Sequence, residues 1–165
     1  MKQKILALSM GILTMLAMSM ATLSDPVSVT TTVSGYMTAT FNYDTVAYSS
    51  QSAGASDVVA PGQADGNYNV TIDTNNNYKV SASGTQFSDG GGHTFAVSNL
   101  KMHANTTADG LSLGLATTLS GDSQVIATGF ATSDTTNYNG FWLSIPGAQF
   151  GAPYTSTLTV TYAAV

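Results

Sequence analysis

Apolar residues recur at every second position through most of this chain, in short runs that are separated by residues favouring turns. Tyr68, Val70 and Ile72 alternate with polar residues, and the segment 158–162 repeats the pattern near the C-terminus. A period of two puts alternate side chains on one face of an extended strand, whereas a helix requires a period near 3.6. The pattern therefore predicts many short β-strands, each with one buried face.

Eight or nine such runs, with no helical pattern after Ala21, predict an all-β fold: an antiparallel β-sandwich of immunoglobulin-like or jelly-roll type. The runs 68–72 and 78–82 flank an Asx-rich loop and predict a β-hairpin. The leucines of the segment 111–115 are interpreted as a strand, and Asp134–Gly140 as a polar turn. The residues expected to face the interior are Phe41, Val70, Ile72, Val80, Phe95, Leu113, Leu143 and Val160.

The N-terminus has the layout of a cleavable signal peptide. Two lysines lie within residues 1–4, a mostly apolar run extends to Met18, and Ser19 and Ala21 provide the small residues of a cleavage site. The apolar run is shorter than the roughly 20 residues that span a bilayer. We therefore expect a signal peptide at 1–21 and a single β-sandwich domain at 22–165, secreted and not held by a membrane.

Charge restricts the partners of the exported chain. After cleavage only Lys79 and Lys101 stand against nine aspartates, and the sequence contains no arginine or glutamate. Nucleic acids and anionic lipids are bound mainly by lysine and arginine, so neither is an expected partner. The chain also contains no cysteine, so packing and hydrogen bonds alone must hold the domain.

Few residues offer catalytic chemistry. The two histidines, His93 and His103, have no nucleophile motif beside them and are interpreted as exposed loop residues. Asp73–Asn77 resembles the opening of a calcium loop, but Tyr78 occupies the glycine position and Gly84 the position of the bidentate glutamate. We therefore predict no catalytic residue, no cofactor and no metal site, and a secreted hydrolase stays a remote alternative.

Two further features concern sugars. Asn69 and Asn105 begin Asn-X-Thr sequons, which become usable in an exported chain, so the protein is a candidate glycoprotein. Aromatic side chains also suit sugar stacking, although the same spacing fits core positions of a sandwich. The aromatics considered for such a platform are Tyr36, Tyr138, Phe141 and Trp142.

Three stretches carry a family resemblance: the segment 68–87, the Phe-Trp-Leu-Ser-Ile-Pro run at 141–146, and the alternating segment 154–162. Together they resemble secreted β-sandwich proteins of prokaryotic surfaces. The chain is similar to archaeal-type surface filament subunits, such as those of bundling pili and threads, and more distantly to bacterial WxL-type wall-associated domains, although true WxL motifs are absent.

The resemblance implies donor-strand complementation, in which the N-terminal strand of one subunit completes the sandwich of the next. The segment 27–33 suits this role because it is uncharged, has one apolar face, and precedes the Ser34-Gly35 pair. The expected function is a non-enzymatic structural subunit of an extracellular filament or surface layer, a homopolymer; the alternative is a monomeric surface adhesion or carbohydrate- or cell-wall-binding sandwich. The assembly residues are Val27, Val29, Thr31 and Val33.

Overall fold

Eleven β-strands make up most of the regular structure in the part of the chain that the computed structural model describes, residues 35–130 and 134–165. Three short 3-10 helices lie between strands, and no α-helix occurs in these described residues. Every strand pairing is antiparallel. The all-β antiparallel sandwich expected from the sequence is confirmed.

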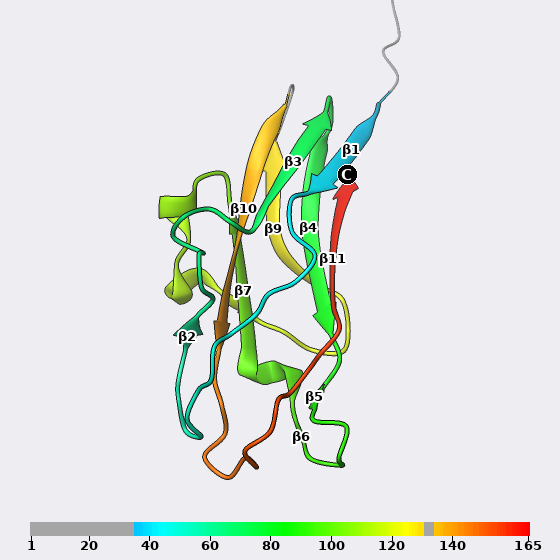
Figure 1. The fold of residues 1–165 in the computed structure, drawn as a ribbon. Helices are drawn as coiled ribbons and strands as arrows, with labels where there is room; N and C mark the ends of the chain where they lie inside the picture. Colours follow the sequence, from blue (N-terminus) through cyan, green and yellow to red (C-terminus); the bar gives the residue numbers. More distant parts are fainter. Residues whose placement is uncertain (1–34, 131–133) are drawn as a thin grey trace, which may run out of the picture. The chain divides into compact units, whose positions relative to one another are not determined.

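The larger layer, sheet A, has the strand order β1-β3-β10-β7-β8, with β2 pairing to the C-terminal end of β10. Figure 1 shows β1, β3, β10, β7 and β2 of this layer. The central strand β10 is therefore hydrogen-bonded on both sides. The strands of sheet A are β1 (Met37–Phe41), β2 (Val58–Val59), β3 (Asn69–Thr74), β7 (Leu100–Asn105), β8 (Thr117–Thr118) and β10 (Thr135–Leu143).

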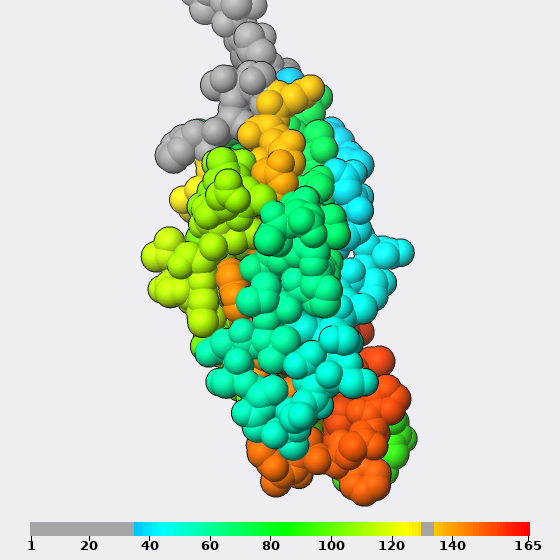
Figure 2. Space-filling model, turned by 60° about the vertical axis from the view of Figure 1, so that its left-hand side comes forward, coloured from blue at the N-terminus to red at the C-terminus, as the bar shows by residue number. Residues whose placement is uncertain are grey.

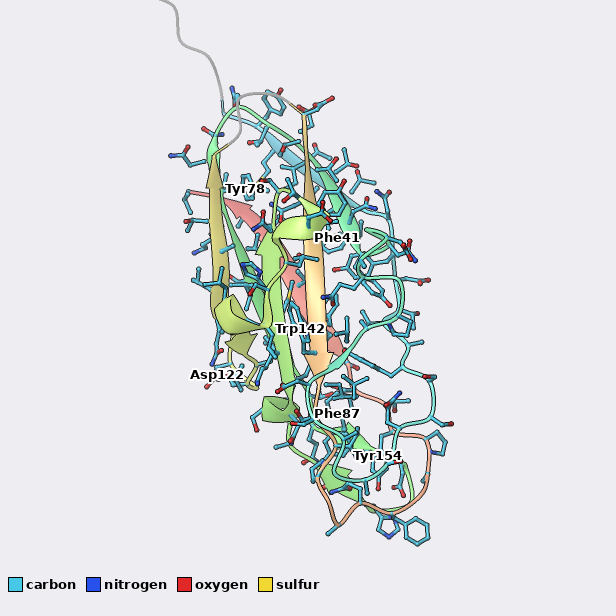
Figure 3. All side chains as sticks on the ribbon, turned by 90° about the vertical axis from the view of Figure 1, so that its left-hand side faces the viewer. Phe41, Tyr78, Phe87, Asp122, Trp142 and Tyr154 are labelled. Atoms are coloured by element: carbon cyan, nitrogen blue, oxygen red, sulfur yellow. The ribbon has the colours of Figure 1, made fainter. Side chains whose placement is uncertain are left out.

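The smaller layer, sheet B, has only three strands, in the order β11-β4-β9. They are β4 (Asn77–Gly84), β9 (Gln124–Phe130) and β11 (Leu158–Ala164). A two-stranded ribbon of β5 (Phe87–Ser88) and β6 (Thr94–Phe95) lies beyond the sandwich, where Figure 3 shows Phe87 near Tyr154. The 3-10 helices are η1 (Val97–Asn99), η2 (Ala108–Gly110) and η3 (Leu113–Leu115).

The core lies between the two sheets. In β3 and in the first four residues of β4 the buried positions alternate, and Val70, Ile72, Tyr78 and Val80 are almost fully buried. The expected interior positions Phe95 and Leu143 are also buried, and Val160 packs partly buried against the core. Burying apolar surface stabilises the fold by about 25 cal/mol per Å². This is the main favourable contribution in such a core, which contains no disulfide.

The hairpin predicted across Asp73–Asn77 is wrong. β3 belongs to sheet A and β4 to sheet B, so the connection is an arch between layers and not a turn within one sheet. Thr74 Oγ1 donates to the Tyr36 carbonyl at 2.8 Å and accepts from the Asn76 backbone N–H at 3.0 Å, which fixes this corner. A hairpin and an arch bury the same alternate positions, so period two cannot distinguish them.

The polar turn predicted at Asp134–Gly140 is also wrong, because β10 begins at Thr135. Its polar residues Asn137 and Asn139 are buried, and Gly140–Leu143 is buried without alternation. The outer face of β10 at Gly140 is covered by the Trp142 ring and the Gln63 side chain, which a Cβ at Gly140 would meet at 2.7 and 3.1 Å. Gln63 Oε1 also accepts from the Phe141 N–H at 2.6 Å. A strand covered on both faces has no reason to alternate.

Two expected interior residues are exposed. Leu113 lies in η3 and not in a strand, so the strand predicted for the segment 111–115 is wrong. Phe41 has the inward parity of β1, with Met37 and Ala39 packed against the core, but it is 39% exposed. It lies in an edge strand, where a neighbouring strand covers it on one side only.

Candidate functional site

Aromatic side chains close the sandwich on one of its two lateral sides, where β1 of sheet A runs beside β11 of sheet B (Figure 1). We call this the closed side. The Phe41 ring meets Tyr162 edge-on, with 5.6 Å between centroids, and meets Tyr43 in the same way at 5.8 Å. Edge-to-face ring pairs contribute roughly 0.5–1.5 kcal/mol beyond burial. These rings therefore join the edges of the two sheets.

A buried asparagine supports the closed side from below the rings. The Asn139 side chain, 1% exposed on β10, donates from Nδ2 to the Tyr43 hydroxyl at 2.8 Å. Its Oδ1 accepts from the Tyr162 hydroxyl at 3.0 Å, so both ends of the amide are paired. Burial raises the pKa of Tyr43 to about 12 and also raises the pKa of Tyr162.

The opposite lateral side, which we call the open side, lies between β9 of sheet B and β7 of sheet A. The short strand β8 pairs only with Lys101 and Met102 of β7, so no described strand pairs with the rest of that edge. A cavity of about 220 Å³ lies between the sheets here. Its walls include Tyr78, Ala104, Asn137 and the β9 segment 127–129.

Asn137 lines this cavity with an incompletely paired amide. The residue is 4% exposed, and its Nδ2 donates to the Tyr78 hydroxyl at 2.7 Å, while its Oδ1 has no hydrogen-bond partner. Exchanging the amide N and O would only move the unpartnered position to the other atom. An unpartnered buried polar group costs about 1–3 kcal/mol. The cavity therefore contains an unused hydrogen-bonding position.

Gly129 shapes the same cavity. A Cβ at this position would overlap the Tyr78 ring, so only glycine lets the ring lie under the β9 backbone. Figure 3 places Tyr78 at the end of the sandwich opposite to Phe87 and Tyr154. Because Gly129 leaves room for the ring, the Tyr78 hydroxyl reaches Asn137 on the facing sheet.

The edge strand β9, Gln124–Phe130, carries no charge and no proline. It pairs with β4 on one side, and no described strand pairs with its other side. Natural edge strands are commonly protected by lysine, proline or a bulge. β9 has only the bulge: Val80 pairs with Ala127 and Ser81 with Val125, which leaves Ile126 as the extra residue. The segment after the bulge is therefore an unprotected edge beside the cavity.

A second hollow, of about 230 Å³, lies on the outer side of sheet A between the segment around Gln63 and the connection around Ala108. Figure 2 shows β10 in orange between these two segments. Gln63 already uses its Oε1 to hold the Phe141 N–H. Its polar group therefore belongs to the fold and is not a free ligand-binding group.

The predicted assembly residues Val27, Val29, Thr31 and Val33, and the predicted signal peptide at 1–21, lie outside the described residues. Both sequon asparagines are described and half-buried. Asn69 donates from Nδ2 to the Gly66 carbonyl at 2.7 Å. Asn105 lines the cavity of the open side, and its Nδ2 donates to the Gly110 carbonyl at 3.0 Å. The nitrogen that would carry a glycan thus holds a local turn in both cases.

The two histidines have different environments. His93 is exposed as expected; its Nδ1 lies 2.6 Å from Asp89 Oδ2, and its ring stacks on Phe150 at 4.5 Å. His103 is 8% exposed in β7, so its predicted exposed loop position is wrong. Its Nδ1 accepts from the Ser112 N–H at 3.1 Å, and burial lowers its pKa.

The four aromatics considered for sugar stacking do not form one surface. Tyr36 is half exposed, whereas Phe141 and Trp142 are buried. Oxygens of the calcium-like loop serve the arch, since Asp73 accepts from the Tyr36 hydroxyl and Asn75 Oδ1 from the Tyr36 N–H, both at 2.9 Å. In residues 35–130 and 134–165, no cluster of three or more His or Asp side chains is suited to holding a metal ion.

Within the same described ranges, no helix has the length and apolar character needed to cross a membrane. Comparison with protein-family models gives no match, and comparison with curated proteins gives none either.

The open side was missed at the sequence level. Its one visible signal is the uncharged run at 124–130, which reads as an apolar segment without indicating that it forms an edge. The cavity depends on Ala104, Asn137 and Gly129, which lie far apart in the chain and meet only when both sheets are assembled. No local motif marks such a site.

Proposed function

We propose that this chain is a structural subunit of an extracellular filament or cell-surface layer, and that it polymerises by adding the strand-forming segment 27–33 to the sandwich of a neighbouring copy. The proposal includes no catalytic step and no cofactor. It follows the likeness of the chain to surface filament subunits of prokaryotes, and export through the predicted signal peptide would place the assembly outside the cell.

The observation that supports the proposal best is the chemistry of the strand edges. Both edge strands of sheet B, β9 and β11, and the edge strand β1 of sheet A contain no charged residue and no proline. An uncharged edge strand is a template for pairing with another chain, which most monomeric proteins prevent. Ordered addition of a strand uses these edges and satisfies their main-chain groups.

The test uses the full exported chain and two double variants of the segment 27–33. Val29→Asp with Val33→Asp puts carboxylates on the apolar face of the segment, whereas Thr30→Asp with Thr32→Asp puts the same charge on its polar face. An unpaired carboxylate strongly opposes burial between sheets, but is tolerated where it faces water. We expect the first variant to abolish polymers and the second to retain them.

The readouts are light scattering and negative-stain electron microscopy of protein that is concentrated and warmed. A wild-type chain that remains monomeric under these conditions would contradict the proposal, and so would equal loss of polymers in both variants. Secretion of all three chains at similar levels is the control that the substitutions do not prevent folding.

A further inference from the structure

The open side has the features of an acceptor groove for one more β-strand. It combines an unprotected edge in β9, a cavity of about 220 Å³, and a buried amide with an unused position at Asn137. Two other buried atoms of the described chain lack partners, the hydroxyls of Tyr48 and Tyr154, but neither residue lines this cavity. The missing contacts on the open side are thus both main-chain and side-chain contacts.

We propose that this groove receives the segment 27–33 of a second copy of the chain, paired along β9 with its valines directed into the cavity. The inference rests on the proposed function and adds the place where the donor strand binds. It assigns the acceptor role to the β9 edge of sheet B and not to the β11 edge, although both edges belong to the same sheet.

The absence of charge in both the cavity lining and the segment 27–33 favours this segment as the occupant. No residue lining the cavity is charged, and the segment 27–33 is uncharged as well. A partner strand with lysine or aspartate on its inner face would bury an unpaired charge. An apolar cavity of about 150 Å³ admits a molecule the size of benzene, so this volume has room for valine side chains. Thr31, which shares the valine face of the segment, would bring a hydroxyl donor into the cavity in which Asn137 Oδ1 lacks a partner.

The donor segment precedes the arch directly in the chain. Tyr36 is held at the arch, because its N–H donates to Asn75 Oδ1 and its carbonyl accepts from Thr74 Oγ1. Gly35 lies against Asn76, and the next residue, Asn77, pairs with Phe130 of β9. A polymer requires the donor to come from another copy, and a cross-link between two separately prepared chains is the observation that shows it.

The bulge in β9 limits where along this strand the donor segment can pair. Ile126 interrupts the pairing with β4, and the regular part that borders the cavity is the segment 127–129. An added strand needs a regular edge for consecutive main-chain hydrogen bonds. We therefore expect close contact at Thr128 and weaker contact at Val125, on the other side of the bulge.

The test is disulfide trapping, which has no background because the chain contains no cysteine. One preparation carries Thr30→Cys, on the polar face of the donor segment, and the other carries Thr128→Cys, an exposed position of β9. The full-length chains are mixed, assembled and mildly oxidised. A disulfide requires Cα atoms about 4.4–6.8 Å apart, which neighbouring strands satisfy.

The matched control is Thr161→Cys, also an exposed threonine of an edge strand of sheet B, but in β11. We expect mixed dimers with Thr128→Cys to exceed those with Thr161→Cys by roughly tenfold or more, because bound partners meet at an effective concentration near millimolar. Val125→Cys should give an intermediate yield.

The outcomes separate the inference from the proposed function. If polymers form and cross-linking favours Thr161→Cys, or no position of β9 cross-links, the groove assignment is wrong while assembly stands. If the wild-type chain does not assemble at all, the proposed function fails and the groove assignment fails with it. Preferential cross-linking at Thr128→Cys supports both.

Discussion

Two asparagines of the same strand differ in how completely their side chains are hydrogen-bonded. Asn139 and Asn137 lie two residues apart in β10, and both side chains are buried. Asn139 is paired at both ends, with Tyr43 and Tyr162, on the closed side. Asn137 is paired only with Tyr78 and borders a cavity on the open side. The same residue type thus completes one region and leaves the other incomplete.

The difference arises from what lies opposite each asparagine. On the closed side, Phe41 of β1, Tyr43 just after it and Tyr162 of β11 lie over the edge of the core. On the open side, β9 is the last strand of sheet B in residues 35–130 and 134–165, and β8 pairs with only two residues of β7. A sandwich in which one layer is a strand short must leave either a cavity or a place for another strand.

The largest expected effect comes from opening the closed side. Phe141 is fully buried and packs edge-on against Tyr43 at 6.2 Å and Tyr68 at 5.6 Å. Phe141→Ala should lower the free energy of unfolding by about 3–5 kcal/mol, because a cavity replaces the ring. Urea denaturation measures this. Val125→Ala on the open side, where the side chain is 56% exposed, is the matched control and should change stability by less than about 0.5 kcal/mol.

High pH should lower the stability of the fold, because the buried tyrosines of the closed side resist ionisation. Because burial raises the pKa of Tyr43 to about 12, the folded chain keeps this proton above pH 10, where the unfolded chain loses it. Stability is therefore complete below pH 10 and falls between pH 10 and 12, by on the order of 2 kcal/mol from this group. Tyr43→Phe should make the loss smaller in thermal melts across that range. An identical alkaline loss in this variant would contradict the assignment.

These two regions also show what sequence patterns can and cannot predict. Alternation correctly placed Val70, Ile72 and Val80 in the interior, because strand parity is a local property of the chain. It did not show that β3 and β4 belong to different sheets, since a hairpin and an arch bury the same positions. Layer assignment depends on pairing partners far away in the sequence.

Polar residues misled for a related reason. Asn137 and Asn139 made the start of β10 look like a turn, yet their amides are directed into the interior, where tyrosine hydroxyls from other strands bind them. The leucines at 111, 113 and 115 alternate with small residues as in a strand, but Leu113 and Leu115 lie in η3 and are exposed. Neither segment could be assigned from its local pattern alone.

The smallest effects, and the sharpest comparison, come from replacing the two asparagines separately. Asn139→Leu leaves the Tyr43 and Tyr162 hydroxyls without their shared partner, so we expect a loss of about 1–3 kcal/mol in the free energy of unfolding. Asn137→Leu removes an amide that was already half unpaired and adds apolar volume beside a cavity. We expect its free energy of unfolding, measured on the isolated subunit, to stay within about 1 kcal/mol of the wild-type value.

Polymer formation should be impaired more by Asn137→Leu than by Asn139→Leu, which is the reverse of their order in folding stability. Asn137→Leu fills part of the groove and removes the position that an added strand would pair with, so its polymers should form only at higher protein concentration than those of the wild type. Asn139→Leu acts on the side away from the groove and should assemble like the wild type at temperatures where it is folded. Light scattering against concentration, with urea denaturation of the same preparations, separates the two effects. Equal stability losses in both variants would remove the distinction between the closed and the open side, and normal assembly of Asn137→Leu would place the donor strand elsewhere.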